Sequence, residues 1–493
     1  MSATESKKSD QPSQSPKPTN EFEDGRKVPP YAWKQSVRDW WNQSWSKKYS
    51  DGIVETRLLS FLPFFPESDG RRTAKLIDTD IGDGNYIHEF YIENSEKPES
   101  ENAKALTASP VKDIVLIHGY AASLGLFFDN FDRLSSIPGV RVHAIDMLGF
   151  GFSSRPDYPN FKHGTVAEIR QNEDWFLDSI EEWRKRRGIE NFVLVGHSFG
   201  GYLSCAYAMK YNQRNNNESN QSMIQKLVLL SPVGVERHEN SLLKDTEHPP
   251  SQVSSSECLA ENSSQPRVSI SREITSNQED IVTGSGSQSG SSGTLNDGIA
   301  NNTTHLDKPE TPTGEADNAD EADKKSKSFR SKIVPWLWEK HVSPFSIMRK
   351  AGPARSKIIS GWTTHRFSHI FYTNPEKFQC IHDYFYRIFN AAGSGEYAIT
   401  RVLGYGALAR LPLLDRCPEK FVKMNLPTLW LYGDKDWMNK DAGEEMTKEI
   451  NGLCKAESKP ELAEFGIINN AGHHLYLDNP DEFADTLIGF LNK

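Results

Sequence analysis

Two parts of the chain, residues 70–235 and 331–493, alternate short apolar runs with longer amphipathic stretches. The apolar runs are of strand length and rich in Val, Ile, Leu and Phe, which indicates strands buried on both faces. They cover residues 113–119, 140–146, 192–195, 226–234, 427–433 and 464–469. Residues 166–187 have apolar side chains at near-helical spacing and predict a long helix. The alternation predicts an α/β fold with a mostly parallel sheet and flanking helices.

Further local patterns complete the expected folded part. Residues 74–92 predict a β-hairpin that turns at the Gly-Asp-Gly-Asn sequence of residues 82–85. Shorter helices are expected at residues 127–134 and 202–211. Residues 345–410 are rich in Phe, Tyr and Ile and predict a helical cap inserted between strands. The last helix is expected over residues 480–492, because Asn479 is a good N-cap and Pro480 a good first residue.

Two segments lack the apolar surface that would offset the entropy of ordering them. Residues 1–29 are rich in Ser, Pro and Lys, and residues 236–330 in Ser, Asn, Thr, Asp, Glu and Gly. The low mean hydropathy of −0.63 agrees with partial disorder. We therefore divide the chain into a disordered tail (1–29), a Trp-rich segment (30–66), a core in two parts (67–235 and 411–493), a low-complexity insertion (236–330) and a helical cap (331–410).

The Trp-rich segment interleaves tryptophans with basic residues. Its apolar residues near helical spacing are Trp33, Val37, Trp40, Trp41 and Trp45. One interpretation is a helix packed on the main domain. The other is that residues 31–65 lie at a membrane surface, because Trp favours the headgroup layer and cations favour anionic lipid. Residues 324–340, basic and with Trp336 and Trp338, are a second candidate membrane contact or the solvated start of a helix.

Composition excludes several classes of function. The formal net charge of −10 gives no general case for nucleic-acid binding. The five cysteines are odd in number, scattered and without metal-binding spacing, which indicates reduced thiols in an intracellular compartment. No apolar run approaches the length of about 18 residues needed to span a bilayer. The acidic residues among the first 30 are unlike an ordinary transit peptide. No metal or cofactor is implied.

The stretch from residue 191 to residue 201 carries the strongest chemical signal. A buried strand leads into a G-x-S-x-G turn, which is followed by a helical pattern. Such a turn needs small residues on either side of its central residue, because strand and helix nearly touch there. Gly196 and Gly200 meet that need, and Ser198 is expected at the tip of the turn as a nucleophile.

A serine hydroxyl becomes a good nucleophile only when a base takes its proton and an acid orients that base. Asp436 and His473 each follow a predicted strand and come after Ser198 in the order Ser, acid, His. Asp434 is the rival acid and His474 the rival base.

An oxyanion hole needs two N–H donors, for which we expect the backbone amides of Tyr120 and Phe199. His118, Asp146 and His197 lie near these motifs, and we expect them to support the loops rather than to catalyse.

Taken together, these motifs resemble the α/β-hydrolases over residues 70–235 and 331–493. The finer resemblance is to the subfamily of the lipid-droplet lipase coactivator, the N-acyl-phospholipid lipases, and the fungal lysophosphatidic acid acyltransferases and cardiolipin-specific deacylases. It rests on residues 33–45, 58–65, 118–122, 196–201, 231–234 and 472–478. The low-complexity insertion departs from the compact family pattern.

The resemblance implies a serine acyl hydrolase that acts on membrane phospholipid through an acyl-enzyme on Ser198, with cardiolipin as a candidate substrate. It also implies the H-x-x-x-x-D motif linked to acyltransfer, here His473 to Asp478. Asp478 immediately precedes a helix start, so a turn residue is the alternative interpretation. An acyl-CoA-dependent lysophosphatidic acid acyltransferase therefore stays open.

A non-catalytic lipase regulator is the third alternative, although the coactivator branch lacks the serine that this chain keeps at Ser198. The resemblance favours the mitochondrial inner membrane as location, with the cytosol or lipid droplets as the alternative.

Overall fold

The computed structural model describes residues 31–96, 113–212, 222–243 and 338–493 of the chain. The predicted tail at 1–29 and most of the predicted insertion at 236–330 lie outside these residues. An eight-stranded sheet forms the centre, in the order β1-β2-β4-β3-β5-β6-β7-β8. Its strands are β1 (Arg72–Gly82), β2 (Asn85–Asn94), β3 (Asp113–Ile117), β4 (Arg141–Ile145), β5 (Phe192–His197), β6 (Ile224–Leu230), β7 (Thr428–Gly433) and β8 (Ala463–Ile468).

The pairing pattern explains why the central strands are continuously apolar. Strands β1, β2 and β4 pair antiparallel, whereas β4, β3, β5, β6, β7 and β8 pair parallel in turn. On β5, Leu194 faces one hydrophobic core while Val193 and Val195 face the other. Both faces are covered, so each residue of the strand is buried. The predicted α/β fold class with a mostly parallel sheet is confirmed.

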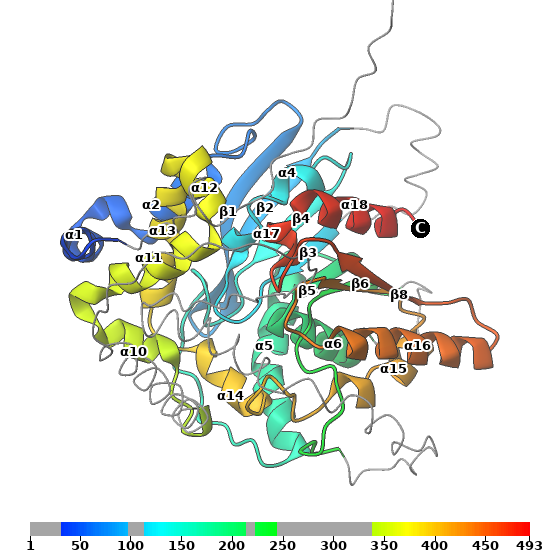
Figure 1. The fold of residues 1–493 in the computed structure, drawn as a ribbon. Coiled ribbons are helices and arrows are strands. Elements are labelled where there is room, and N and C mark those ends of the chain that lie inside the picture. Colours follow the sequence, from blue (N-terminus) through cyan, green and yellow to red (C-terminus); the bar gives the residue numbers. More distant parts are fainter. Residues whose placement is uncertain (1–30, 97–112, 213–221, 244–337) are drawn as a thin grey trace, which may run out of the picture.

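Helices cover the two faces of the sheet (Figure 1). On one side lie α5 (Val166–Arg186), α6 (Phe199–Tyr211), α15 (Pro418–Met424) and α16 (Lys440–Ala456). On the other lie α4 (Phe131–Leu134), α17 (Leu475–Asp478) and α18 (Pro480–Leu491). The helix expected at 127–134 is instead a 3-10 turn, η2 (Leu124–Phe127), followed by the single turn of α4. The side chain of Asn479 caps α18 as predicted, accepting from the Glu482 N–H.

The predicted cap consists of α10 (Pro344–Lys350), α11 (Arg355–Arg366), α12 (Ser368–Thr373), α13 (Pro375–Asn390) and α14 (Ile399–Val402). The N-terminal helices α1 (Trp33–Trp45) and α2 (Asp51–Leu59) lie against this cap (Figure 1). Among the described residues, no helix is both long and apolar enough to cross a membrane.

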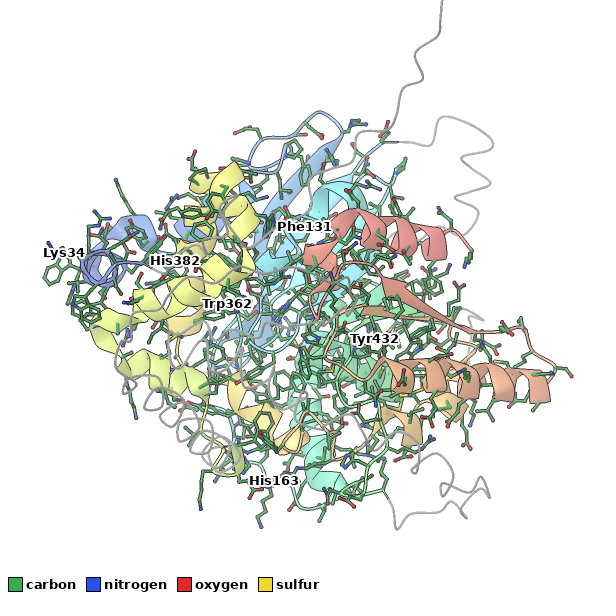
Figure 2. All side chains as sticks on the ribbon, in the orientation of Figure 1. Lys34, Phe131, His163, Trp362, His382 and Tyr432 are labelled. Atoms are coloured by element: carbon green, nitrogen blue, oxygen red, sulfur yellow. The ribbon has the colours of Figure 1, made fainter. Side chains whose placement is uncertain are left out.

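The helix α1 is docked by its polar side, not by its apolar side. Ser36 and Gln43 are buried, and the Gln43 amide donates to Asp383 of α13. Trp33, Trp41 and Trp45 are 55%, 61% and 74% exposed. The interpretation of residues 33–45 as a helix packed on the main domain is therefore confirmed, but its packed side is polar and the three tryptophans face outward. The inward face of α1 is polar because α11 and α13 offer it buried hydrogen-bond partners. One of them is Ser356 of α11, which donates to Asp39 and contacts His382 of α13, a residue labelled in Figure 2.

Candidate active site

Ser198 occupies the sharp turn between β5 and α6. Its backbone has φ 53° and ψ −118°, a left-handed conformation that L-residues rarely adopt. The turn is possible because Gly196 and Gly200 lack side chains. A Cβ on Gly196 would collide with Ser204, and one on Gly200 would collide with the His118 carbonyl oxygen. The strained turn presents the Ser198 hydroxyl at the carboxyl edge of the sheet.

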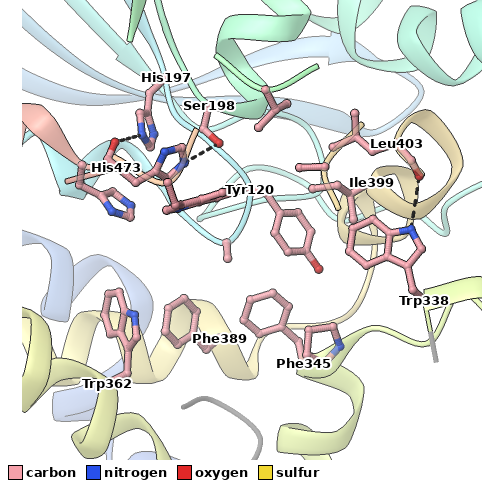
Figure 3. Close-up of a pocket in the computed structure, with 16 residues that line it drawn as sticks. Tyr120, His197, Ser198, Trp338, Phe345, Trp362, Phe389, Ile399, Leu403 and His473 are labelled. Atoms are coloured by element: carbon pink, nitrogen blue, oxygen red, sulfur yellow. Dashed lines mark hydrogen bonds between the residues drawn. The ribbon is translucent and has the colours of Figure 1, made fainter. Parts of the chain in front are cut away.

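The structure brings Ser198, His473 and Asp436 together in one hydrogen-bonded row. His473 Nε2 lies 3.0 Å from Ser198 Oγ, and His473 Nδ1 lies 3.3 Å from Asp436 Oδ1 (Figure 3 draws the first of these bonds). Asp436 and His473 lie in loops that follow β7 and β8, whose carboxyl ends meet at the same edge of the sheet as that of β5. The indole ring of Trp437 lies 4.9 Å from the His473 ring, between centroids. This arrangement can activate a serine hydroxyl and orient the base that does so.

The two rival residues lie elsewhere. Asp434 is exposed, and its carboxylate accepts the Ala471 N–H instead of contacting His473. His474 is buried, and its ring lies 5.5 Å from that of His473. Among the described residues, His474 makes no hydrogen bond with Ser198.

The Asp436 carboxylate is held in its charged form. Burial alone would raise its pKa, but the positive charge and hydrogen bond of His473, with the Met438 N–H, bring the pKa below its usual value. The side chain of Ser231, the first residue after β6, also lies beside this carboxylate and lowers its pKa further. Because Asp436 stays ionised, it can stabilise a protonated His473.

The two amides expected to form an oxyanion hole flank the serine. Phe199 is the first residue of α6, so its N–H has no partner within the helix. Tyr120 follows Gly119, where a Cβ would lie 2.9 Å from Ser198 Cβ, so this loop runs directly against the nucleophile. These two amides are therefore suitably placed to stabilise the negative charge that develops on a substrate oxygen next to Ser198.

Nearby histidines support the site. His118 is buried, accepts the Met147 N–H on one ring nitrogen and contacts the Gly119 carbonyl with the other. His197 Nε2 lies 2.9 Å from the His473 carbonyl oxygen and holds the backbone of the base. Burial, with the charge of His473, lowers the pKa of His197 well below its usual value, so this ring is neutral. Asp146 accepts the Leu124 and Phe152 amides and ties down two loops.

A pocket of about 820 Å³, including the open space at its mouth, leads away from Ser198 (Figure 3). Its walls are mostly apolar, with Tyr120, His197, His473 and His474 near Ser198. The apolar part includes Val233, Trp338, Phe345, Trp362, Phe389, Ile399, Leu403 and Trp437. A mostly apolar pocket of this kind suits a hydrocarbon chain attached to a carbonyl at Ser198.

Trp338 lies in the pocket wall and is 7% exposed, with its indole N–H donating to the Leu403 carbonyl. The expectation that Trp338 belongs to a membrane-contacting segment is therefore wrong for this residue, because the cap buries it. The rest of the 324–340 segment, apart from residues 339–340, lies outside the described residues.

Asp478, the acidic residue of the H-x-x-x-x-D motif, points away from the nucleophile. Its Oδ2 accepts the Gly472 N–H at 2.9 Å, and its Oδ1 accepts from Arg366 of α11 at 2.6 Å. Asp478 therefore fixes the loop that carries His473 and ties it to the cap. Of the two residues in this motif, only His473 contacts Ser198 in the part of the chain that is described.

This geometry predicts a mild effect for Asp478→Asn. Loss of the charge should destabilise the fold by about 1.5 kcal/mol, the low end for a hydrogen bond to a charged group. Fatty acid release and acyl transfer should each fall less than about tenfold, because the amide can still accept the Gly472 N–H. Thermal unfolding and both activities would be measured, with the exposed Asp481→Asn as the matched control. A loss as deep as that of a Ser198 variant would contradict the positioning role.

Sequence patterns missed several residues of the site. Trp437 could have been noticed because it directly follows Asp436. Trp362 and Phe389 carried no local signal, since they reach the pocket only through the packing of α11 and α13. Within the described residues, no group of His, Cys, Asp or Glu is arranged to hold a metal ion.

Comparisons with known proteins agree with this site. A family model described as the alpha/beta hydrolase fold matches residues 113–252. A probable 1-acylglycerol-3-phosphate O-acyltransferase of Oryza sativa subsp. japonica is 29% identical over 82% of this chain and 73% of its own length. A 1-acylglycerol-3-phosphate O-acyltransferase of Arabidopsis thaliana is 27% identical over 92% of this chain and 82% of its own length.

A third similarity is shorter. A (lyso)-N-acylphosphatidylethanolamine lipase of Homo sapiens is 36% identical over 28% of this chain and 36% of its own length. These similarities support an enzyme that acts on lipid esters.

Proposed function

Because the chain belongs to the α/β-hydrolases, we propose that it is a serine acyl hydrolase that cleaves phospholipid esters at a membrane surface. The observation that carries the proposal is the row from Ser198 Oγ through His473 to Asp436, which lies at the end of a deep apolar pocket. The row supplies nucleophile, base and acid, and the pocket accommodates an acyl chain.

In the proposed reaction, His473 takes the proton of the Ser198 hydroxyl as Oγ attacks the acyl carbonyl carbon. The Tyr120 and Phe199 amides bind the negative oxygen of the tetrahedral intermediate. His473 then gives its proton to the leaving lysophospholipid oxygen, which leaves an acyl ester on Ser198. Water attacks this ester, His473 takes a proton from the water, and the fatty acid leaves as the proton returns to Ser198.

Acyl transfer to a lysophospholipid is the second candidate. In this reaction Ser198 would take the acyl group from acyl-CoA, with His473 giving its proton to the leaving coenzyme A thiol, and the alcohol of a lysophosphatidic acid would then replace water in the second half. Two relatives that match most of the chain carry 1-acylglycerol-3-phosphate O-acyltransferase names, which favours this candidate.

Incubating the purified protein with mixed phospholipid vesicles and labelled acyl-CoA separates the two candidates. Fatty acid release without consumption of acyl-CoA would support the hydrolase. Formation of labelled phosphatidic acid that requires acyl-CoA would overturn it in favour of the transferase.

Vesicles that contain cardiolipin are included, because cardiolipin is our proposed phospholipid and the mitochondrial inner membrane our proposed location. Fractionation that finds the protein in the cytosol or on lipid droplets would contradict that location.

The exposed stripe of α1 supports contact with a membrane surface. Trp33, Val37, Trp41 and Trp45 recur every four residues on the outer side of the helix and are all exposed. Basic residues flank the stripe: Lys34 and Arg38 on α1 and Lys47 and Lys48 after it (Figure 2 labels Lys34 at this outer edge). Indole rings at headgroup depth with cations beside them are typical of helices that lie in a membrane interface. We propose that this stripe attaches the protein to anionic lipid.

Replacing Trp33, Trp41 and Trp45 together with serine should weaken binding to anionic vesicles at least about 1,000-fold, because the three side chains together contribute at least about 4.5 kcal/mol. The reason is that burying one large apolar side chain contributes about 1.5–3 kcal/mol, and every 1.4 kcal/mol is tenfold in affinity. Co-sedimentation with vesicles would measure the change.

The matched control is Tyr86→Ser, an exposed aromatic on β2 outside the stripe. It should bind vesicles as the unaltered protein does. Hydrolysis of a soluble ester should persist in the triple variant, since the stripe lies on the side of α1 away from the cap. Unchanged vesicle binding by the triple variant would refute the attachment.

A further inference from the structure

A cluster of basic side chains lies on the far side of one pocket wall. That wall is α14, where Ile399 and the following Leu403 line the pocket. Arg401, on the opposite side of the same turn, is 9% exposed. The guanidinium of Arg401 donates only to neutral acceptors, the Phe161 and Tyr397 carbonyls and the Asn160 side chain. The Arg401 guanidinium also lies over the Tyr158 ring, 5.4 Å from its centroid, but no carboxylate pairs with it among the described residues.

Arg410 adds a second cation to the cluster. Its Nε donates to the Arg401 carbonyl oxygen at 3.0 Å, and this is the one hydrogen bond of its side chain with the part of the chain that is described. The terminal guanidinium nitrogens are therefore unpartnered there, although the residue is only half exposed. Burial lowers the pKa of both Arg401 and Arg410, and neither forms an ion pair within the described residues.

Two histidines complete the cluster. The rings of His163 and His341 lie 4.7 Å apart and nearly perpendicular, and His341 Nδ1 lies 2.8 Å from the Thr400 hydroxyl (Figure 2 labels His163). His163 comes just before α5, whose N-terminus adds partial positive charge. Burial and the charges of Arg401 and Arg410 lower the pKa of both rings, that of His341 to about 4.

The carboxylates that face the cluster do not neutralise it directly. Glu168 acts on His163, but its oxygens cap α5 by accepting the Gly164 and Thr165 amides. Glu339 acts on Arg410 from an exposed position without forming an ion pair. Among the described residues, the local potential is therefore positive where the terminal nitrogens of Arg410 have no hydrogen-bond partner.

A short segment connects this cluster to the acyl pocket. Trp338 lines the pocket and bonds to Leu403, while His341, three residues later, bonds to Thr400. The helix α14 therefore separates the cluster from the pocket, and the diameter of one helix is about 10 Å. A group bound there would lie beyond α14, so the part of the substrate that joins it to a carbonyl at Ser198 would have to pass around this helix.

We propose that Arg410, Arg401, His163 and His341 form a phosphate-binding site that serves the same active site. The planar fork of Arg410 can donate two parallel hydrogen bonds to phosphate oxygens. The two histidines become donors when an anion lies beside them. The ligand is a phosphate group joined to the acyl chain through several bonds, either the headgroup of a lipid or the phosphates of a soluble acyl carrier. This inference rests on the proposed function, because it assigns the phosphate to the substrate of Ser198.

Titration calorimetry of the full chain with inorganic phosphate, glycerol 3-phosphate and coenzyme A tests the site. Arg410→Gln should weaken binding at least about tenfold, the effect of one hydrogen bond to a charged group. Arg410→Lys should bind more tightly than Arg410→Gln, because it keeps the charge. The matched control is Arg71→Gln, an arginine with 62% of its side chain exposed, which should bind as the unaltered protein does.

The probes also identify the source of the phosphate. Tighter binding of coenzyme A than of glycerol 3-phosphate assigns the site to an acyl carrier, and the reverse order assigns it to a lipid headgroup. Saturating phosphate should raise the titration midpoint of the His341 ring in NMR, because a bound anion stabilises the imidazolium.

The inference is overturned if no phosphate probe binds, or if Arg410→Gln binds as tightly as the unaltered protein with its thermal stability intact. Hydrolysis of an uncharged soluble ester by the unaltered protein tests the proposed function separately. Hydrolysis without phosphate binding would contradict only the phosphate-binding site. Phosphate binding without hydrolysis would contradict only the proposed enzyme activity.

Discussion

Ser198→Ala is expected to lower fatty acid release from phospholipid vesicles by about 10⁴- to 10⁶-fold, as removal of a catalytic serine does in other triads. The physical reason is that no other hydroxyl lies within hydrogen-bond distance of His473 Nε2 among the described residues. Without Ser198 an acyl-enzyme cannot form, and only the pocket and the amide donors remain. Release of labelled fatty acid under saturating substrate is the measurement.

The matched control is Ser204→Ala, six residues after Ser198 in α6. Its hydroxyl donates only to the Gly200 carbonyl and contacts no residue of the row. It should keep most of the activity. Equal losses in both variants would mean that a disturbed turn, rather than a missing nucleophile, explains the result for Ser198.

Asp436→Asn should have the second largest effect, a loss of about 10⁴-fold in kcat. The asparagine keeps the shape of the side chain but has no charge to stabilise protonated His473. Its amide can also donate to Nδ1, which would turn the ring into the tautomer that cannot accept the serine proton. Steady-state kinetics on a soluble ester would measure the loss without interference from membrane binding.

Asp434→Asn is the natural comparison, since Asp434 was the rival acid and lies two residues away. Its carboxylate accepts the Ala471 N–H in the turn before His473, so its loss should cost less than about tenfold in rate. If Asp434→Asn proved the more damaging of the two, the assignment of the acid would be reversed.

The centre of the fold could be predicted because its signals are local. Continuous apolar runs of strand length marked β3, β5 and β7, since a strand covered on both faces has no polar side. The glycines around Ser198 marked the sharp turn, because only glycine fits where strand and helix touch. The structure then brings together Asp436 and His473, which lie far apart in sequence, as their chain order predicted.

The remaining features depend on packing that no short stretch encodes. The periodicity of α1 revealed an apolar stripe but not its direction, because the side that docks was decided by partners such as Asp383 more than 300 residues later. Trp338 looked like a surface residue beside a basic run, yet the cap buries it. Asp478 belonged to a motif by sequence, but its partner Arg366 comes from α11 and turns it away from Ser198.

The helix α1, with its exposed tryptophans, and the cap helices that cover the apolar pocket are one packed unit. Tyr31 bonds to Ser360 of α11 and Ser36 bonds to the Pro353 carbonyl, while Trp362 and Phe389 of the same cap line the pocket. A lipid surface bound by α1 would therefore lie next to the helices that cover the substrate site. This arrangement agrees with a substrate that enters from a membrane rather than from solution.

The most direct test of the account is to locate a fluorophosphonate adduct by mass spectrometry after the purified protein reacts with the probe. The account predicts a single adduct on the peptide that carries Ser198, and no labelling of Ser198→Ala. A protein that binds lipid vesicles but gives no adduct on Ser198 would contradict both enzyme candidates and leave a non-catalytic lipid-binding regulator.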